Sequence, residues 1–225
     1  MMNDFSPLFV SLKVSVTATI ITFAMGIAAA WLIGRLKRGR NIADVLLSLP
    51  MVLPPTVVGF FLLLAFGKDG FAGKFLANIG MNVLFTWQGA VVAAVAVSLP
   101  IMYRTVRGAF EQIDKNIIAA ARTLGMSESR IFFRIMIPMA RPGIAAGSLL
   151  SFARALGEFG ATMMVAGNIP GKTQTMSIAI YTAMQGGNRE AAYVWVFIVL
   201  AIPFVIILLM NLWNERMYKR SGVSR

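Results

Sequence analysis

Long apolar runs alternate with short basic segments along this chain of 225 residues. A membrane-spanning helix needs about 20 largely apolar residues, and five runs are close to that length or longer. They cover approximately residues 8–34, 45–66, 85–103, 142–165 and 191–213. The pattern predicts an all-α, polytopic bundle of about five transmembrane spans, forming a single domain over residues 1–225.

The second run contains three prolines, Pro50, Pro54 and Pro55. Adjacent prolines remove two amide donors and disturb a helix. One interpretation is a bent segment lining a pathway, in which Thr56 or the freed carbonyl groups meet a substrate. The other is a packing kink of the kind common in membrane helices. The sequence leaves both open.

The composition is typical of a membrane protein and excludes several kinds of chemical site. The chain is 58% hydrophobic and only 13% charged, against about 25% charged in soluble domains. A net charge of +12 would fit a nucleic-acid partner, but the long uncharged runs argue against one and for contact with lipid. Cys and His are absent, which removes thiol chemistry and most zinc and haem sites. We therefore expect no catalytic residue, metal or cofactor in this chain.

Lysine and arginine are divided unequally between the two sides of a five-span bundle. Segments 35–44 and 104–141, with the tail after the last run, hold fifteen of them. The opposite side holds five: Lys13, Lys68, Lys74, Lys172 and Arg189. Positively charged loops stay in the cytoplasm. The N-terminus is therefore expected outside and the C-terminus in the cytoplasm.

Residues 166–173 read AGNIPGKT, one letter from the phosphate-binding pattern G-x-x-x-x-G-K-[ST]. Such a loop follows a β-strand and opens a helix whose amides face the phosphates. Here the preceding element is an apolar membrane run, and the expected orientation places Lys172 outside, away from ATP. We interpret the stretch as an exposed Pro-Gly turn. The semi-polar residues 173–189 that follow predict a short external helix.

The segment of about residues 104–141 is the longest cytoplasmic loop. Asp114 or Asn116 is expected to cap a short helix over residues 117–124, and Gly125 suits the position just past its end. Ser127 is then expected to cap a second helix with Glu128 in its first turn. An amphipathic loop helix lying on the membrane surface and a docking site for a partner both fit this pattern.

The same segment resembles the coupling loop of ABC-importer permeases, whose pattern is E-A-A-x-x-x-G, nine residues, then I-x-L-P. The residues at the matching positions are Ala120, Ala121, Gly125, Ile135 and Pro138, while Ala119 replaces the family's Glu and Ile137 its Leu. The resemblance implies that this helix docks into a cleft of a separate ATPase subunit. The implied docking surface consists of Ala120, Ala121, Arg122, Thr123, Leu124 and Gly125.

Three stretches, LPMVLPPTVVGFFLL, AARTLG and SFARALGEFGATMMVAGNIPGKTQTMSIAIYTAMQGG, resemble molybdate permease subunits of the ModB type. The likeness runs from about residue 8 to residue 213, and sulfate/thiosulfate permeases share part of it. It implies import of molybdate, and of tungstate, across a bacterial inner membrane. The implied partners are a second copy of this chain, an ATPase dimer at the cytoplasmic face and a periplasmic molybdate-binding protein.

Arg154 and Glu158 are charged residues within the fourth apolar run. Residues four apart share a helix face, and charges within a membrane usually face the bundle interior or a wet cavity. Arg154 either offers positive potential to an anion in the pathway or neutralises Glu158 as structural support. Both residues are expected to be sensitive to substitution.

Two other classes of membrane protein fit the spans. A secondary carrier or channel would normally show a repeat with paired broken helices or a series of titratable residues, and neither is visible in the sequence. A membrane enzyme would need a catalytic cluster that a chain without His and Cys hardly offers.

Overall fold

The computed structural model describes residues 4–36 and 38–220, without the side chains of residues 211 and 213–220. Lys37 and Arg225 of the basic segments therefore lie outside the described residues, as do the side chains of the other basic residues of the tail. Within the described part there is no strand, so the predicted all-α class is confirmed. The helices are α1 (Ser6–Gly34), α2 (Arg40–Val52), α3 (Pro55–Phe66), α4 (Phe71–Asn78), α5 (Trp87–Glu111), α6 (Lys115–Thr123), α7 (Glu128–Ile131), a π-helical turn (Phe132–Met136), α8 (Ile137–Met139), α9 (Arg141–Leu156), α10 (Gly160–Ala166), α11 (Met176–Gln185) and α12 (Arg189–Arg220).

Three of the described helices, α1, α5 and α12, are long and apolar enough to cross a membrane. The number rises to five if each of two bent helix pairs forms one span. The first pair is α2 and α3, bent by 114° at Leu53 and Pro54. The second joins the segment Glu128–Met139 to α9 with a bend of 73°. The number of spans therefore depends on how these bent pairs lie in the bilayer.

Helix α1 packs against α5 along a stripe of small residues. The buried positions of α1 recur every three or four residues and include Ser15, Ala18, Thr22 and Gly26. A Cβ atom built on Gly26 would lie 2.6 Å from Cγ of Met102 in α5. Membrane helices associate through such small residues, because lipid supplies no hydrophobic force between them. The Ser- and Thr-rich character of the first apolar run is thus a packing feature.

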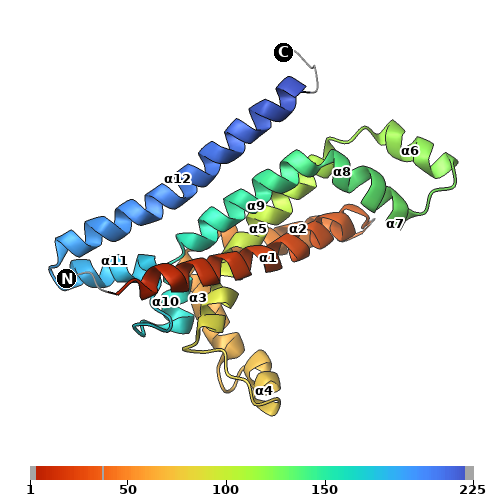
Figure 1. Cartoon of the computed structure of the whole chain (residues 1–225). Helices are drawn as coiled ribbons and strands as arrows, with labels where there is room; N and C mark the ends of the chain where they lie inside the picture. The colour runs from red at the N-terminus through yellow and green to blue at the C-terminus, as the bar shows by residue number, and fades with distance from the viewer. Residues whose placement is uncertain (1–3, 37, 221–225) are drawn as a thin grey trace.

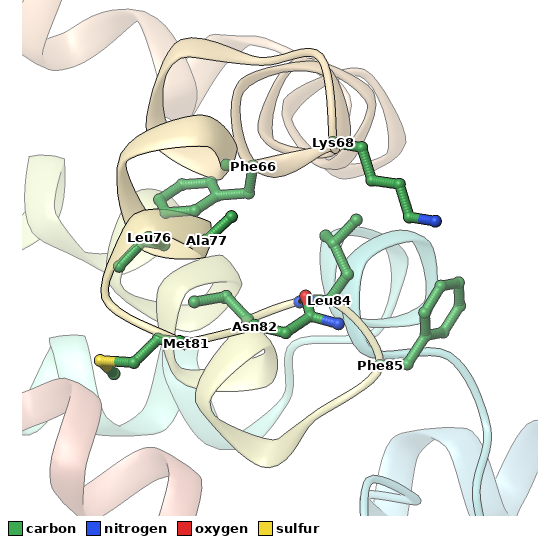
Figure 2. Close-up of a pocket in the computed structure, with 11 residues that line it drawn as sticks. Phe66, Lys68, Leu76, Ala77, Met81, Asn82, Leu84 and Phe85 are labelled. Carbon is green, nitrogen blue, oxygen red and sulfur yellow. Dashed lines mark hydrogen bonds between the residues drawn. The ribbon is translucent and has the colours of Figure 1, made fainter.

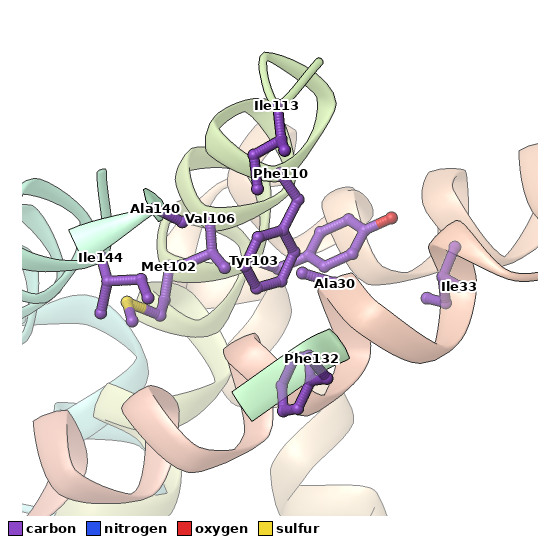
Figure 3. Packing of buried hydrophobic residues seen from close by; sticks show 10 residues of the cluster. All are labelled: Ala30, Ile33, Met102, Tyr103, Val106, Phe110, Ile113, Phe132, Ala140 and Ile144. Carbon is purple, nitrogen blue, oxygen red and sulfur yellow. The ribbon is translucent and has the colours of Figure 1, made fainter. Parts of the chain in front are cut away.

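A hydrophobic cluster joins the C-terminal parts of α1 and α5 to the start of α9. Figure 3 shows Tyr103 and Phe110 of α5 beside Ala30 of α1, with Phe132 of the π-helical turn close to them. Phe132 also stacks on Trp31, with ring centroids 4.7 Å apart. The residues between α7 and α9 are therefore anchored to α1 and α5 by aromatic contacts.

In two places the helices differ from the predicted apolar spans. The third was expected to end near residue 103, but α5 continues to Glu111 and places Arg104 and Arg107 on a helix. The fourth was expected to be continuous over residues 142–165. It breaks at Gly157–Phe159, because α9 ends at Leu156 and α10 starts at Gly160.

The elements are distributed along one long axis (Figure 1). Helices α6 and α7 lie at one end, while the start of α1, α11 and the start of α12 lie at the other. Helix α12 runs apart from α9 over much of its length, and only 6% of its most apolar window is buried. Helix α4 lies below the other helices in this view.

Candidate functional site

Helix α6 is formed and ended by local signals in the sequence. The Asp114 carboxylate caps it by accepting a hydrogen bond from the amide of Asn116 at 2.8 Å. At the other end, Gly125 adopts a φ of +73°, and its amide donates to the carbonyl of Arg122, while that of Met126 donates to the carbonyl of Ala121. These two bonds satisfy carbonyl groups at the helix end, and the positive φ favours glycine. The predicted helix, its cap and its terminal glycine are confirmed.

The expected docking residues do not all lie on one accessible face. Ala120, Arg122, Thr123, Leu124 and Gly125 are exposed, and Leu124 is 81% exposed. Ala121 is buried, with 4% exposure. A partner approaching α6 would therefore meet the Leu124 side of the helix, while the Ala121 methyl group faces the chain itself.

Glu128 links α6 to α7 and to α1. Its carboxylate accepts two hydrogen bonds from Arg122, at 2.7 and 3.2 Å, and lies 3.9 Å from the guanidinium of Arg35 just after α1. The hydrogen bonds to this carboxylate raise the pKa of Arg122. Ser127 caps α7, as predicted, by accepting from the amide of Arg130. The orientation of α6 is thus fixed by an ion pair as well as by its glycine.

The residues expected within the membrane lie at two helix breaks. Leu53 and Pro54 separate α2 from α3, Pro55 is the first residue of α3, and Thr56 is exposed in its first turn. The second break, after α9, lies against the first, since a Cβ atom built on Gly160 would lie 3.2 Å from Cβ of Pro55 and 3.3 Å from Cγ2 of Thr56. The structure therefore brings together two interrupted helices that the sequence could not pair.

Arg154 and Glu158 form an ion pair across the end of α9. Nη1 of Arg154 lies 2.6 Å from Oε2 of Glu158, and the two side chains are 32% and 1% exposed. The other oxygen, Oε1, accepts a hydrogen bond from the amide of Ala161 at 2.8 Å. The carboxylate thus bridges α9 and α10 across the break, while the guanidinium reaches a more open environment.

The AGNIPGKT turn does not have the geometry of a phosphate-binding loop. The amides of Lys172, Thr173 and Gln174 all donate to the carbonyl oxygen of Ile169, and the amide of Ile169 donates to the Thr173 hydroxyl. A phosphate cradle needs such amides free to point at the ligand. The helix before the turn is α10 and the helix after it is α11, so the strand that precedes such a loop is also missing from this described region.

Two hollows are lined by residues of the loop before α5. One, of about 420 Å³, is enclosed by α4 and residues 80–85, and Figure 2 shows Phe66 and Leu84 on its walls, with Lys68 at its edge. The second, of about 620 Å³, lies between the start of α1, the start of α5 and the AGNIPGKT turn. It is lined by Phe9, Val10, Lys13, Phe85, Thr86, Trp87, Gln88, Gly171 and Lys172.

Sequence reasoning missed a polar cluster that ties α2 to α5. The Tyr103 hydroxyl donates to Asp44 and accepts from Arg107, both at 2.9 Å, and Arg107 also pairs with Asp44 and Glu111. Arg107 was counted only as a loop charge. The spacing of four residues between Tyr103, Arg107 and Glu111 is the signal that would have indicated a continuing helix.

Comparison with known proteins gives consistent matches over nearly the whole chain. Residues 20–221 match the profile of the family described as binding-protein-dependent transport system inner membrane component. The chain is 43% identical over 205 residues to YvgM of Bacillus subtilis (strain 168), covering 90% of each chain. It is 42% identical over 222 residues to the molybdenum transport system permease protein ModB of Escherichia coli (strain K12), covering 97% of each.

A sulfate transport system permease protein, CysT of Salmonella typhimurium, is 35% identical over 212 residues, which is 94% of this chain and 76% of CysT. Among solved structures, the fold is similar to a chain of the bacterial alginate ABC transporter in complex with an alginate pentasaccharide-bound periplasmic protein. The TM-score is 0.77 at 16% identity, covering 97% of this chain and 81% of that one. At this identity the likeness concerns the fold alone.

Proposed function

This chain belongs to the family of binding-protein-dependent transport system inner membrane components, and on that premise we propose that it is the permease subunit of an ATP-driven molybdate importer. The observation that supports molybdate as the substrate is the 42% identity to ModB over 97% of both chains. Tungstate, a tetrahedral dianion of similar size, is a second expected substrate. Sulfate is the alternative, supported by the 35% identity to CysT.

We place the chain in the bacterial inner membrane with five spans. The spans are α1, the bent pair α2–α3, α5, α9 with its preceding segment, and α12. The N-terminus lies outside and the C-terminus in the cytoplasm, because fifteen basic residues then lie inside and five outside. This orientation agrees with the separation of α6 and α11 at opposite ends of the long axis (Figure 1).

Three partners complete the importer. A second copy of this chain forms the other half of the pathway, and a periplasmic molybdate-binding protein delivers the anion from outside. A pair of ATPase subunits docks on the coupling loop, residues 104–141, where α6 presents the exposed Leu124 side chain. ATP hydrolysis belongs to those subunits, because the Lys172 turn commits its amides to Ile169.

The geometry of α6 supports a coupling role. Force applied to this helix passes through the Arg122–Glu128 ion pair to α7 and through the stacked rings of Phe132 and Trp31 to α1. It also reaches α9, which begins directly after α8. A movement of the docked ATPases is thereby delivered to two spans at once.

The break near Glu158 is the proposed position of the anion pathway within this chain. Pro55 and Thr56 face the second break there, and the exposed Thr56 hydroxyl can donate a hydrogen bond that is weak enough to let a dianion leave again. Pro54 lies beside them in the chain. Arg154 mainly neutralises the buried Glu158 carboxylate, because the two groups are 2.6 Å apart. A tight arginine site would oppose release of the transported anion.

The test is transport by the reconstituted complex. The chain is placed in proteoliposomes with the ATPase subunit and the molybdate-binding protein of the same organism, and uptake of radioactive molybdate is measured with and without ATP. We expect uptake that requires both ATP and the binding protein and is inhibited by tungstate more strongly than by sulfate. Uptake driven by an ion gradient without ATP would instead indicate a secondary carrier, and preferential inhibition by sulfate would support the sulfate alternative.

A further inference from the structure

Two lysines line the hollow of about 620 Å³ between the start of α1, the start of α5 and the AGNIPGKT turn. Lys13 lies in the second turn of α1, and Lys172 lies in the AGNIPGKT turn. The sequence separates these residues by more than 150 positions, and only the fold brings them to one hollow. Both side chains are exposed, while Phe9 and Trp87 supply apolar wall between them.

Both lysines are held by rigid surroundings. The Nζ of Lys13 lies 3.7 Å from the centre of the Trp87 ring, a cation–π contact. Lys172 lies in a turn next to Thr173, which is fully buried. The Thr173 hydroxyl accepts a hydrogen bond from the amide of Ile169. The side-chain amide of Asn168 donates a hydrogen bond to the Thr182 hydroxyl of α11 and accepts one from the side chain of Gln174. These bonds hold the backbone of the turn, so Lys172 projects from a defined place on the surface.

Neither lysine takes part in a salt bridge among the described residues. In all six ion pairs found there the cation is an arginine. Arg107 takes part in two of them, and Arg35, Arg40, Arg122 and Arg154 in one each. Uncompensated positive charge outside also runs against the usual distribution of charge in membrane proteins. Two lysines, one of them in contact with the Trp87 ring, line an open, partly aromatic hollow and form a surface that is complementary to a carboxylate.

We propose that this hollow is a docking point for the periplasmic binding protein and receives an aspartate or glutamate side chain from its surface. The proposal rests on the proposed function, which supplies a binding protein on this side of the membrane. Charges at the rim of an interface steer association and fix its register, and aromatic residues are enriched in interfaces. Because both lysines are exposed, a free dianion would be largely screened by water there, whereas a protein surface excludes water as it docks.

The first experiment measures ATPase activity of the reconstituted complex at increasing concentrations of molybdate-loaded binding protein. Lys13→Gln and Lys172→Gln should each raise the half-saturating concentration about two- to fivefold, and the double variant should raise it further. Maximal activity should stay unchanged. Added salt should weaken docking of the native chain more than docking of the double variant. Lys74→Gln, an equal charge change on α4 outside this hollow, is the matched control.

The outcomes separate the two proposals. If the binding protein does not stimulate the native complex, the proposed function fails. If it does, and both lysine variants behave like Lys74→Gln, the docking proposal alone is overturned. A fall in maximal rate with an unchanged half-saturating concentration would also overturn it, because the lysines would then act on the anion.

A second measurement identifies the occupant directly. The chain has no cysteine, so Lys172→Cys carries a single thiol for a photoactivatable crosslinker. Crosslinking to the binding protein, suppressed by excess unlabelled binding protein, supports the proposal. Crosslinking only to a second copy of this chain overturns it, since the hollow would then be covered within the dimer.

Discussion

The ion pair between Arg154 and Glu158 gives the sharpest prediction about this chain. The perturbation is a set of three variants, Glu158→Ala, Glu158→Gln and Arg154→Gln. Glu158 is 1% exposed, with one oxygen on the Ala161 amide and the other 2.6 Å from Arg154. Glu158→Ala removes both contacts, leaving a buried amide without its acceptor and a cation without its partner.

The magnitudes follow from these contacts. A hydrogen bond involving a charged group contributes about 1.5–3 kcal/mol, and removing one member of a buried pair costs about 3–5 kcal/mol. Arg154 is 32% exposed, so water screens part of its attraction. We expect a loss of about 3 kcal/mol for Glu158→Ala and about 1 kcal/mol for Glu158→Gln, which keeps an acceptor for Ala161. Arg154→Gln should lie between them.

The assay is thermal unfolding in detergent, followed by tryptophan fluorescence, together with transport in proteoliposomes. If the pair is structural, transport should follow stability and Glu158→Gln should retain most of it at low temperature. An unfolding midpoint for Glu158→Ala equal to that of the native chain would refute the bridging role of the carboxylate. Arg154→Gln with unchanged stability but abolished transport would show instead that the guanidinium acts on the anion.

Three further predictions test packing, docking and topology. Gly26→Val should cost about 1–3 kcal/mol by overpacking, because its Cβ would meet Met102, whereas Gly34→Ala, with open space around it, should unfold like the native chain in the same fluorescence assay. Leu124→Asp should lower co-purification of the ATPase at least about tenfold with an unchanged unfolding midpoint; undiminished co-purification would contradict docking on α6. Lys172→Cys should react with an impermeant maleimide in intact cells and Arg122→Cys only after lysis, and the reverse labelling would overturn the proposed orientation.

Much of the coupling segment could be predicted from sequence because its signals are local. Asp114 and Ser127 cap helices within three residues of themselves, and Gly125 adopts its positive φ whatever packs against it. The contacts that orient this segment could not be predicted in the same way. Glu128 meets Arg35 and Phe132 meets Trp31 across about a hundred residues, and spacing carries no information about such pairs.

The existence of the long helices could be predicted from sequence, but their end points could not. Apolar runs determined where the long helices exist, because burial of uncharged segments in lipid depends on composition and length. Helix α4 lies outside every such run. The runs did not determine where the helices stop. Helix α5 continues to Glu111, and its last turns carry Arg107 in contact with Tyr103, Asp44 and Glu111. The fourth run breaks after Leu156, and the Glu158 carboxylate accepts from the amide of Ala161 across this break.

The sequence by itself determined the class of this protein: an all-helical membrane chain whose basic residues gather in a few short segments and which contains no Cys or His. Those properties are sums over composition and local pattern, so they do not depend on how the helices meet. Only the tertiary structure decided that the proline break of α2–α3 lies against the break after α9, and that Lys13 and Lys172 share one hollow. Such juxtapositions depend on which helix faces touch, and small residues such as Gly26 fix those faces through close contact rather than through any periodic signal.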